Sequence, residues 1–245
     1  MIQLFNTVLY QPIYNLLVFL YNIVPGNDIG LAIIALTIII KVILYPFGVQ
    51  AIKAQKQLQD IQPKLDELKS KHKDDKEKLA SETMKIYKEQ KVNPLSSCLP
   101  LLIQFPFLIA VYHAFRTGLA SSDLNLLYSF VPNPGHINSI SAGIIDLAVP
   151  SILLAVLAGA AQFVQTKMMP MAQPKIKTDA SKDESMMASM NKSMLYFMPV
   201  MTIIIGINLP AGLTLYWLLT TVLTTVQQKI LFRKKQNMTT IVEAK

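Results

Sequence analysis

Lys41 carries the clearest chemical signal in the sequence, because it is the only charge in the long apolar segment 29–49. A Lys near the centre of a membrane span costs about 2.5–3.5 kcal/mol, and such residues are usually functional. An acidic partner is missing, since the apolar segments contain no Asp or Glu and Asp146 lies only at the edge of one. We therefore expect Lys41 to face water or neutral acceptors in a polar cavity. The alternative is a structural Lys bonded to backbone carbonyls at a kink.

Neutral polar residues recur in the same apolar segments. Thr37 precedes Lys41 by one helical turn and shares its face. Each polar residue alone is more often an interhelical contact than a site, but together with an unpaired Lys they would line a wet groove. The set is Thr37, Gln104, Gln162, Gln165, Thr202, Asn208, Thr214, Thr220 and Thr221. A single Trp in such a segment, here Trp217, is more often a packing residue.

Enzyme chemistry has little support in the sequence. The only cysteine is Cys98, and the histidines are His72, His113 and His136. One cysteine excludes an intrachain disulfide framework and a repeated CxxC metal site. The motifs HExxH, GxSxG, Walker A and GxGxxG are absent. We therefore expect no enzyme activity, no metal and no cofactor.

The composition predicts an all-α integral membrane protein. Of the 245 residues 52% are hydrophobic and 16% are charged, against about 25% charged in a soluble domain, and the mean hydropathy is +0.38. A span needs about 20 apolar residues, and five segments qualify. We expect transmembrane helices at 29–50, 94–116, 147–167, 190–209 and 211–232.

The basic residues orient these helices. Residues 51–93 contain eleven Lys, residues 167–192 contain five, and the tail from Lys229 contains five Lys or Arg. The only Lys or Arg in the segments 1–28, 116–146 and 208–212 is Arg116. Because basic loops stay in the cytoplasm, the N-terminus is expected outside and the C-terminus inside. Segments 1–28 and 117–146 are then extracytoplasmic, and 51–93, 168–189 and 233–245 are cytoplasmic.

Residues 1–28 are typical of an amphipathic helix lying in the membrane interface. The apolar face comprises Leu9, Ile13, Leu16, Leu17, Leu20, Ile23 and Val24. A polar face carries Gln11, Asn15 and Asn22, and the residues suited to the headgroup boundary are Tyr10, Tyr14 and Tyr21. Pro25-Gly26-Asn27 ends the helix. A sixth span or an uncleaved signal anchor is the alternative.

Residues 51–93 predict a cytoplasmic helical hairpin. The first helix has an apolar stripe that consists of Leu58, Ile61, Leu65 and Leu68. Pro63 is expected to kink or start this helix, which ends at Lys71-His72-Lys73. Asp74 and Glu77 resemble a capping box for the second helix, whose apolar residues are Leu79, Met84 and Tyr87. Eight Asp or Glu nearly balance the eleven Lys. We expect a mobile, solvated helical hairpin with no specific nucleic-acid site.

A series of short motifs then becomes recognisable. In chain order they are Lys41-x4-Pro46, Gln62-Pro63-Lys64, Tyr87-Lys88, Lys91-Val92-Asn93-Pro94, Pro100-Leu101-Leu102-Ile103-Gln104-x-Pro106, Lys167-Met168, Phe197-Met198-Pro199-Val200, Pro210-Ala211-Gly212-Leu213-x-Leu215-Tyr216-Trp217 and Gln227-Gln228. From about residue 12 to residue 235 the chain strongly resembles the YidC-type membrane protein insertases, the family that also includes the mitochondrial and chloroplast insertases.

The resemblance implies a five-helix core around a hydrophilic groove that opens to the cytoplasm and to lipid. In the family a basic residue of the first span attracts the acidic end of a nascent membrane protein, and here that position is Lys41. Thr37, Gln165 and Trp217 match groove positions, and Gln104 belongs to the motif of the second span. The implied location is the bacterial cytoplasmic membrane, and the implied state is a monomer. The implied partners are nascent membrane proteins, with the ribosome, the signal-recognition targeting machinery and the Sec translocon as further candidates.

The chain departs from the family pattern at three points. The family position at Lys41 is typically Arg, and Lys lacks its planar fork of donors. A lipobox cysteine and a large extracytoplasmic domain are missing, which is typical of the minimal five-span form. The tail after Phe232 is short, so strong ribosome docking through it is not expected.

Two other classes of function remain as alternatives. A small secondary transporter or channel predicts internal repeats and a carboxylate for ion coupling, and the sequence has neither. An intramembrane protease needs a nucleophile motif, which is also missing.

Overall fold

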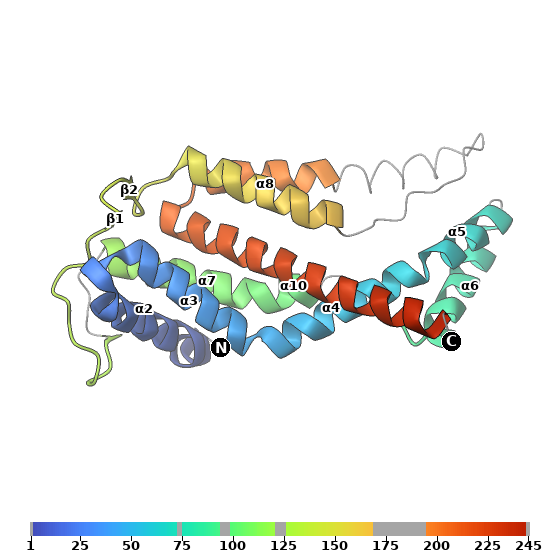
Figure 1. Ribbon diagram of the computed structural model, residues 1–245, viewed down its shortest axis with the longest axis horizontal. Helices are drawn as coiled ribbons and strands as arrows, with labels where there is room; N and C mark the ends of the chain where they lie inside the picture. The colour runs from blue at the N-terminus through green and yellow to red at the C-terminus, as the bar shows by residue number, and fades with distance from the viewer. Residues whose placement is uncertain (1, 73–74, 94–98, 121–125, 169–194, 244–245) are drawn as a thin grey trace.

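The computed structural model describes residues 2–72, 75–93, 99–120, 126–168 and 195–243. The described chain is mostly helical and elongated, with an irregular loop over residues 126–150 at one end and a pair of polar helices at the other (Figure 1). We call these the loop end and the hairpin end. Both lie far from the middle of the bundle, where α3, α7, α8 and α10 run alongside one another.

The N-terminal segment is one helical rod. Helix α1 (Ile2–Phe5) passes through a π-helical turn (Asn6–Tyr10) into α2 (Gln11–Ile23), and a 3-10 turn at Pro25–Asn27 ends it. The predicted stop at Pro25-Gly26-Asn27 is confirmed, with Gly26 at φ 71°. The headgroup role predicted for Tyr10, Tyr14 and Tyr21 is wrong, because all three pack into the core.

The first predicted span is not one straight helix. Helix α3 (Ile29–Ile43) ends at Leu44, and the chain bends by 66° into α4 (Tyr45–Asp60). Pro46 lies in the first turn of α4, where a missing N–H costs nothing, whereas in an unbroken helix its ring would clash with the preceding turn. Lys41 therefore lies in the last turn of α3, directly before this bend.

The remaining long helices differ from expectation at their ends. Helix α7 (Leu99–Ala120) runs past 116, and α8 (Ile152–Met168) begins after Pro150. The fourth predicted span appears as the helix Leu195–Gly206, and its first residues, 190–194, lie outside the described residues. Helix α10 (Ala211–Glu243) continues beyond 232 to the hairpin end.

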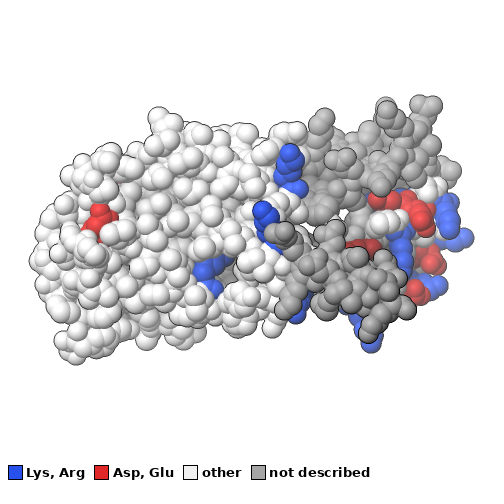
Figure 2. All heavy atoms as spheres, in the orientation of Figure 1, with Lys and Arg blue, Asp and Glu red and all other residues white. Residues whose placement is uncertain are grey.

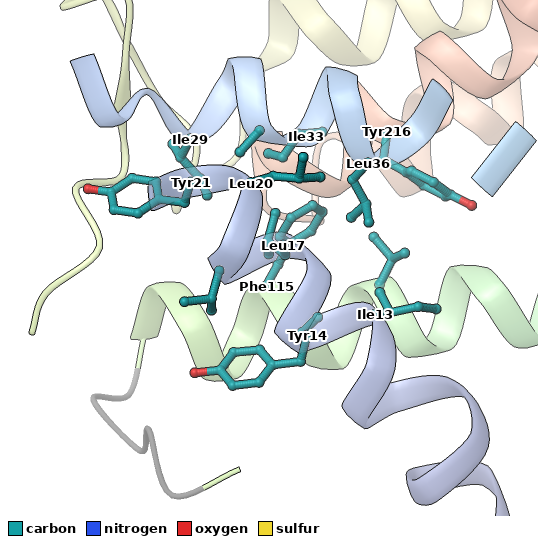
Figure 3. Packing of buried hydrophobic residues seen from close by; sticks show 14 of the residues in the cluster. Ile13, Tyr14, Leu17, Leu20, Tyr21, Ile29, Ile33, Leu36, Phe115 and Tyr216 are labelled. Carbon is teal, nitrogen blue, oxygen red and sulfur yellow. The ribbon is translucent and has the colours of Figure 1, made fainter. Parts of the chain in front are cut away.

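Buried apolar residues of α2, α3, α7 and α10 form the core (Figure 3). Leu17 of α2, Leu36 of α3 and Phe115 of α7 are almost inaccessible to solvent. Tyr216 brings α10 into the same cluster. The apolar face predicted for residues 9–24 packs against neighbouring helices except at Ile23, which is 60% exposed.

The predicted hairpin is present at the hairpin end. Helix α5 (Gln62–Lys71) follows α4, has Pro63 in its first turn and packs against α6 (Lys76–Glu89). A small core of its own comprises Ile61, Leu65 and Val92, with Leu58, Ile86 and Tyr87 against it. The N-cap of α6 is Asp75, whose carboxylate accepts from Lys78 N, one residue after the predicted Asp74, which lies outside the described residues. Met84 of the same helix is 52% exposed and lies outside this core.

Length and composition alone identify few membrane spans in this structure. Within the described ranges no single helix is both long and apolar enough to qualify, although α3 and the segment Tyr45–Lys71 qualify together as a bent pair.

Candidate functional site

Among the described residues, Lys41 contacts α10 through one hydrogen bond. Its ammonium Nζ lies 2.6 Å from Thr224 Oγ1 and donates to it. Thr224 in turn donates its hydroxyl proton to the backbone oxygen of Thr220, at 2.6 Å, so the lone pairs of Thr224 are left for the ammonium. Lys41 lies in the last turn of α3, where the helix dipole favours a cation.

No carboxylate neutralises this ammonium in the described part of the chain. The ion pairs there, Lys69 with Asp66 and Lys85 with Glu82, both belong to the hairpin. Figure 2 shows the same separation on one face, with charged side chains gathered at the hairpin end and few over the bundle. The expectation that Lys41 has neutral acceptors agrees with its contact to Thr224.

Two more polar contacts join α10 to its neighbours. Gln104 of α7 donates to Tyr216 Oη at 2.8 Å, and Gln227 donates to the Tyr45 carbonyl of α4 at 3.5 Å. Tyr216, Thr220, Thr224 and Gln228 are each four residues apart, so they follow one side of α10. We call these four residues the polar strip.

Gln228 stands out within the polar strip. Its side chain is 1% exposed, and its Oε1 has no hydrogen-bond donor among the described residues. A buried acceptor without a donor costs about 1–3 kcal/mol. In proteins, buried polar atoms of this kind are commonly satisfied by an ordered water.

The five predicted site residues do not converge on one point. Lys41 and Gln104 both reach α10, at Thr224 and Tyr216 respectively. Thr37 is 0% exposed and donates to the Ile33 carbonyl of its own helix. Gln165 on α8 and Trp217 on α10 are half-buried, on two helices that pack closely together.

Sequence reasoning missed Thr224 and gave Tyr216 no site role. The signal was present as the four-residue spacing of polar side chains along residues 216–228. The partnership of Lys41 with Thr224 joins residues 183 positions apart, which periodicity within one helix does not reveal.

Comparisons with known proteins identify the family. The family model described as 60Kd inner membrane protein matches residues 19–238. Membrane protein insertase YidC of Fusobacterium nucleatum is 35% identical over 228 residues, which are 91% of this chain and 98% of that protein. The YidC of Mannheimia succiniciproducens is 36% identical over 225 residues, 91% of this chain and 36% of that protein. The chain thus spans nearly all of the first relative and little more than a third of the second.

The fold has a solved counterpart. A crystal structure of an active YidC insertase with its first transmembrane domain resolved matches with a TM-score of 0.58 and 21% identity, over 91% of this chain and 45% of that one. The likeness of fold agrees with the motif series from Lys41 to Gln228. The chain belongs to the YidC-type insertase family, the family of 60Kd inner membrane proteins.

Proposed function

We propose that this chain is a non-enzymatic insertase that moves nascent membrane proteins into the bacterial cytoplasmic membrane. The observation that carries the proposal is the Lys41 ammonium at the junction of α3 and α10, bound to Thr224 and without a carboxylate among the described residues. A cation of this kind attracts the acidic end of a client. It does so more strongly beside an apolar bundle than in open water.

The proposed route follows the polar strip of α10. Gln228, Thr224 and Tyr216 lie along it from the hairpin end toward the loop end, so a client segment entering from the hairpin end meets Gln228 first, then Lys41 at Thr224, and then Tyr216. Polar groups lose most free energy where they lose water, and this strip shortens the dry part of the path. The apolar part of the client then leaves into lipid, which yields roughly 25 cal/mol per Å² buried.

The proposal includes a topology. Five membrane-spanning segments, built on α3, α7, α8, the helix Leu195–Gly206 and α10, place the loop end outside and the hairpin end in the cytoplasm. The Lys-rich composition of residues 51–93 and the charge gathered at the hairpin end (Figure 2) support this orientation. The segment α1–α2 packs beside α3 and α7 at the outer side, and nascent membrane proteins are the proposed clients of a single copy of the chain.

The test is insertion of a single-span reporter whose translocated tail carries no, one or two Asp residues, in proteoliposomes holding the full chain. Lys41→Arg is expected to insert all three tails as the parent does. Lys41→Ala is expected to impair the Asp-bearing tails and spare the neutral one, and Lys41→Glu to be worse, because it reverses the field.

A matched control is Lys229, an exposed cation of the same helix bundle on α10. Lys229→Glu changes the net charge by the same amount away from the polar strip and is expected to leave the tail preference intact. Equal insertion of all three tails by the parent, Lys41→Ala and Lys41→Glu would falsify the proposed role of the charge.

A further inference from the structure

Asp28 holds a second link between α3 and α10, at the opposite end from Lys41. As the N-cap of α3, its Oδ1 accepts from Leu31 N at 3.0 Å. The same carboxylate accepts from the Ser141 hydroxyl at 2.7 Å and from the Ala142 amide. Asp28 therefore ties the loop at 141–142 directly to the start of α3.

That loop also binds the start of α10. We call residues 138–149 the strap; it contains the short hairpin of β1 (Ile140–Ser141) and β2 (Ile145–Asp146). Its carbonyls at Leu147 and Val149 accept from the amides of Gly212 and Ala211, each at 2.9 Å. The first amides of a helix have no partner within the helix, so the strap supplies their acceptors.

The fit of the strap on α3 is close. A Cβ atom added to Gly30 would lie 2.1 Å from Ser141 Oγ, so any larger residue there would push Ser141 away from Asp28. The turn of the hairpin has Ala142 at φ 51° and Gly143 at φ 70°, which directs the Ala142 amide at the carboxylate. At the other edge of the strap, the Asn138 amide donates to Tyr21 Oη at 3.0 Å.

We propose that Asp28 is a positioning residue for the Lys41 site: it latches the strap across the first turns of α3 and α10 and so fixes how these two helices meet. Lys41 and Thr224 lie on the same two helices. If the strap is released from Asp28 at the loop end, the geometry of the Lys41–Thr224 bond depends on the packing of α3 against α10. The positioning role rests on the proposed function, whereas the latch itself does not.

The latch is tested by hydrogen exchange of residues 138–149 in the full chain. Asp28→Ser keeps an N-cap oxygen for Leu31 N but is too short to reach Ser141 and Ala142, so exchange of the strap is expected to rise about tenfold or more. Asp28→Asn is also expected to raise exchange of the strap, because the side-chain NH2 of Asn would face the Ser141 hydroxyl or the Ala142 N–H, both of which donate to the carboxylate. Ser141→Ala removes one of the two bonds, cannot disturb the cap of α3, and is expected to give a smaller rise.

Asp146→Asn is the matched control. Asp146 is the other carboxylate of this region, and it accepts from Ala148 N at 2.9 Å and from the Ser139 side chain, both within the strap, without a hydrogen bond to α3 among the described residues. Its loss is expected to leave the Asp28 latch closed. Unchanged exchange of the strap in both Asp28→Ser and Asp28→Asn overturns the latch, whatever the Lys41 variants do.

The positioning role has its own readout. A merely destabilised protein loses insertion of neutral and Asp-tailed reporters equally, whereas a displaced Lys41 loses the Asp-tailed reporters selectively, by a few-fold or more. If an Asp28 variant shows faster exchange of the strap but inserts the three reporter tails with the same preference as the parent, the positioning role is overturned. If Lys41→Ala inserts all three tails as the parent does, the proposed role of the Lys41 charge and the positioning role of Asp28 are both overturned, and the exchange result alone then decides the latch.

Discussion

Lys41 Nζ and Thr224 Oγ1 are 2.6 Å apart, and this bond joins the last turn of α3 to α10. Because α3 bends away into α4 immediately afterwards, the bond lies at the point where the apolar bundle meets its polar extension. The strap on Asp28 joins the same two helices at their first turns. The pair α3–α10 is therefore tied at both ends, with the apolar core between the ties.

Thr224→Val removes the acceptor of Lys41 with little change of shape. We expect the Asp-tail preference to weaken and stability to fall by about 1.5–3 kcal/mol, the usual range for a hydrogen bond to a charged group. Reporter insertion and thermal unfolding in nanodiscs measure the two effects. Thr225→Val is the control, because Thr225 donates only to the Thr221 carbonyl of its own helix. Equal effects of the two substitutions would show that the contact with Lys41 has no special role.

Asn15 joins α2 to the loop that follows α7. Its amide donates to the carbonyls of Gln11 and Leu126, and its oxygen accepts from Tyr128 N at 2.6 Å. Asn15→Leu leaves the groups of Leu126 and Tyr128 without this partner, and we expect a loss of at least about 2 kcal/mol in unfolding free energy. Asn22 makes one exposed bond, to the Pro132 carbonyl, so Asn22→Leu should cost less than about 1 kcal/mol.

Gly159 lets α8 approach the helix Leu195–Gly206. A Cβ there would lie 2.4 Å from Ile203 Cγ1 and 3.0 Å from the Pro199 carbonyl oxygen, so Gly159→Ala is expected to destabilise by about 1–3 kcal/mol. Gly48→Ala is the contrasting case: its neighbour is the flexible amide of Gln227, at 3.1 Å. In the helix α4 that change should be neutral or stabilising by up to about 1 kcal/mol. Thermal unfolding distinguishes the two signs, and partial rescue of Gly159→Ala by Ile203→Ala would locate the clash.

The sequence predicts the helical faces well and their partners poorly. Periodicity assigns most residues of α2 to the correct face, but Ile23 is exposed, Asn15 is buried, and the polar face binds backbone of residues 126–132. The reason is that a loop with unpaired carbonyls satisfies Asn and Gln as well as water does. Tyr14 shows the converse error: a phenol that suits a headgroup boundary is also a large apolar surface, and here the core buries it completely.

The bend after Lys41 shows the limit of hydropathy. Apolar residues continue through 44–49, so a window average favours one straight span, whereas Pro46 can only be accommodated by starting a new helix. The bend does not affect the prediction that Lys41 has neutral surroundings, because that prediction rests on the lack of Asp and Glu in the apolar segments. Thr224 was not foreseen, because only the packing of α3 on α10 selects it from the five threonines of residues 214–225.

The hairpin of α5 and α6 is expected to exchange its amide protons much faster than α3 and α10. Its own core is small and consists mainly of Ile61, Leu65 and Val92, and many of its backbone hydrogen bonds are close to solvent, which lowers the cost of local opening. Hydrogen exchange of the full chain, read separately for residues 62–89 and 211–232, measures the difference. Protection of the hairpin equal to that of α10 would contradict the expected mobility.

Acid is expected to open the strap through Asp28. Burial raises the pKa of this carboxyl, but hydrogen bonds from Ala142, Ser141, Leu31 and Gly30 outweigh it and hold the pKa below its ordinary value of 3.8. A carboxyl with a lowered folded-state pKa contributes stability above its unfolded pKa and loses it as the pH falls through the folded value. Strap exchange, corrected for intrinsic rates, should therefore be constant between about pH 7 and 5 and rise only below 3.8.

The second carboxyl of the region has to be separated from this effect. The pKa of Asp146 is also lowered, by hydrogen bonds from Ala148 and Ser139, so both groups titrate in the same acid range. Asp146→Asn should keep the acid-induced opening of residues 138–149, because the tie to Ala142 remains. Asp28→Asn should reduce the acid-induced rise in exchange, since its strap is already open at neutral pH and only Asp146 is left to titrate. If the acid transition persists in Asp28→Asn and disappears in Asp146→Asn, the carboxyl that closes the strap is Asp146.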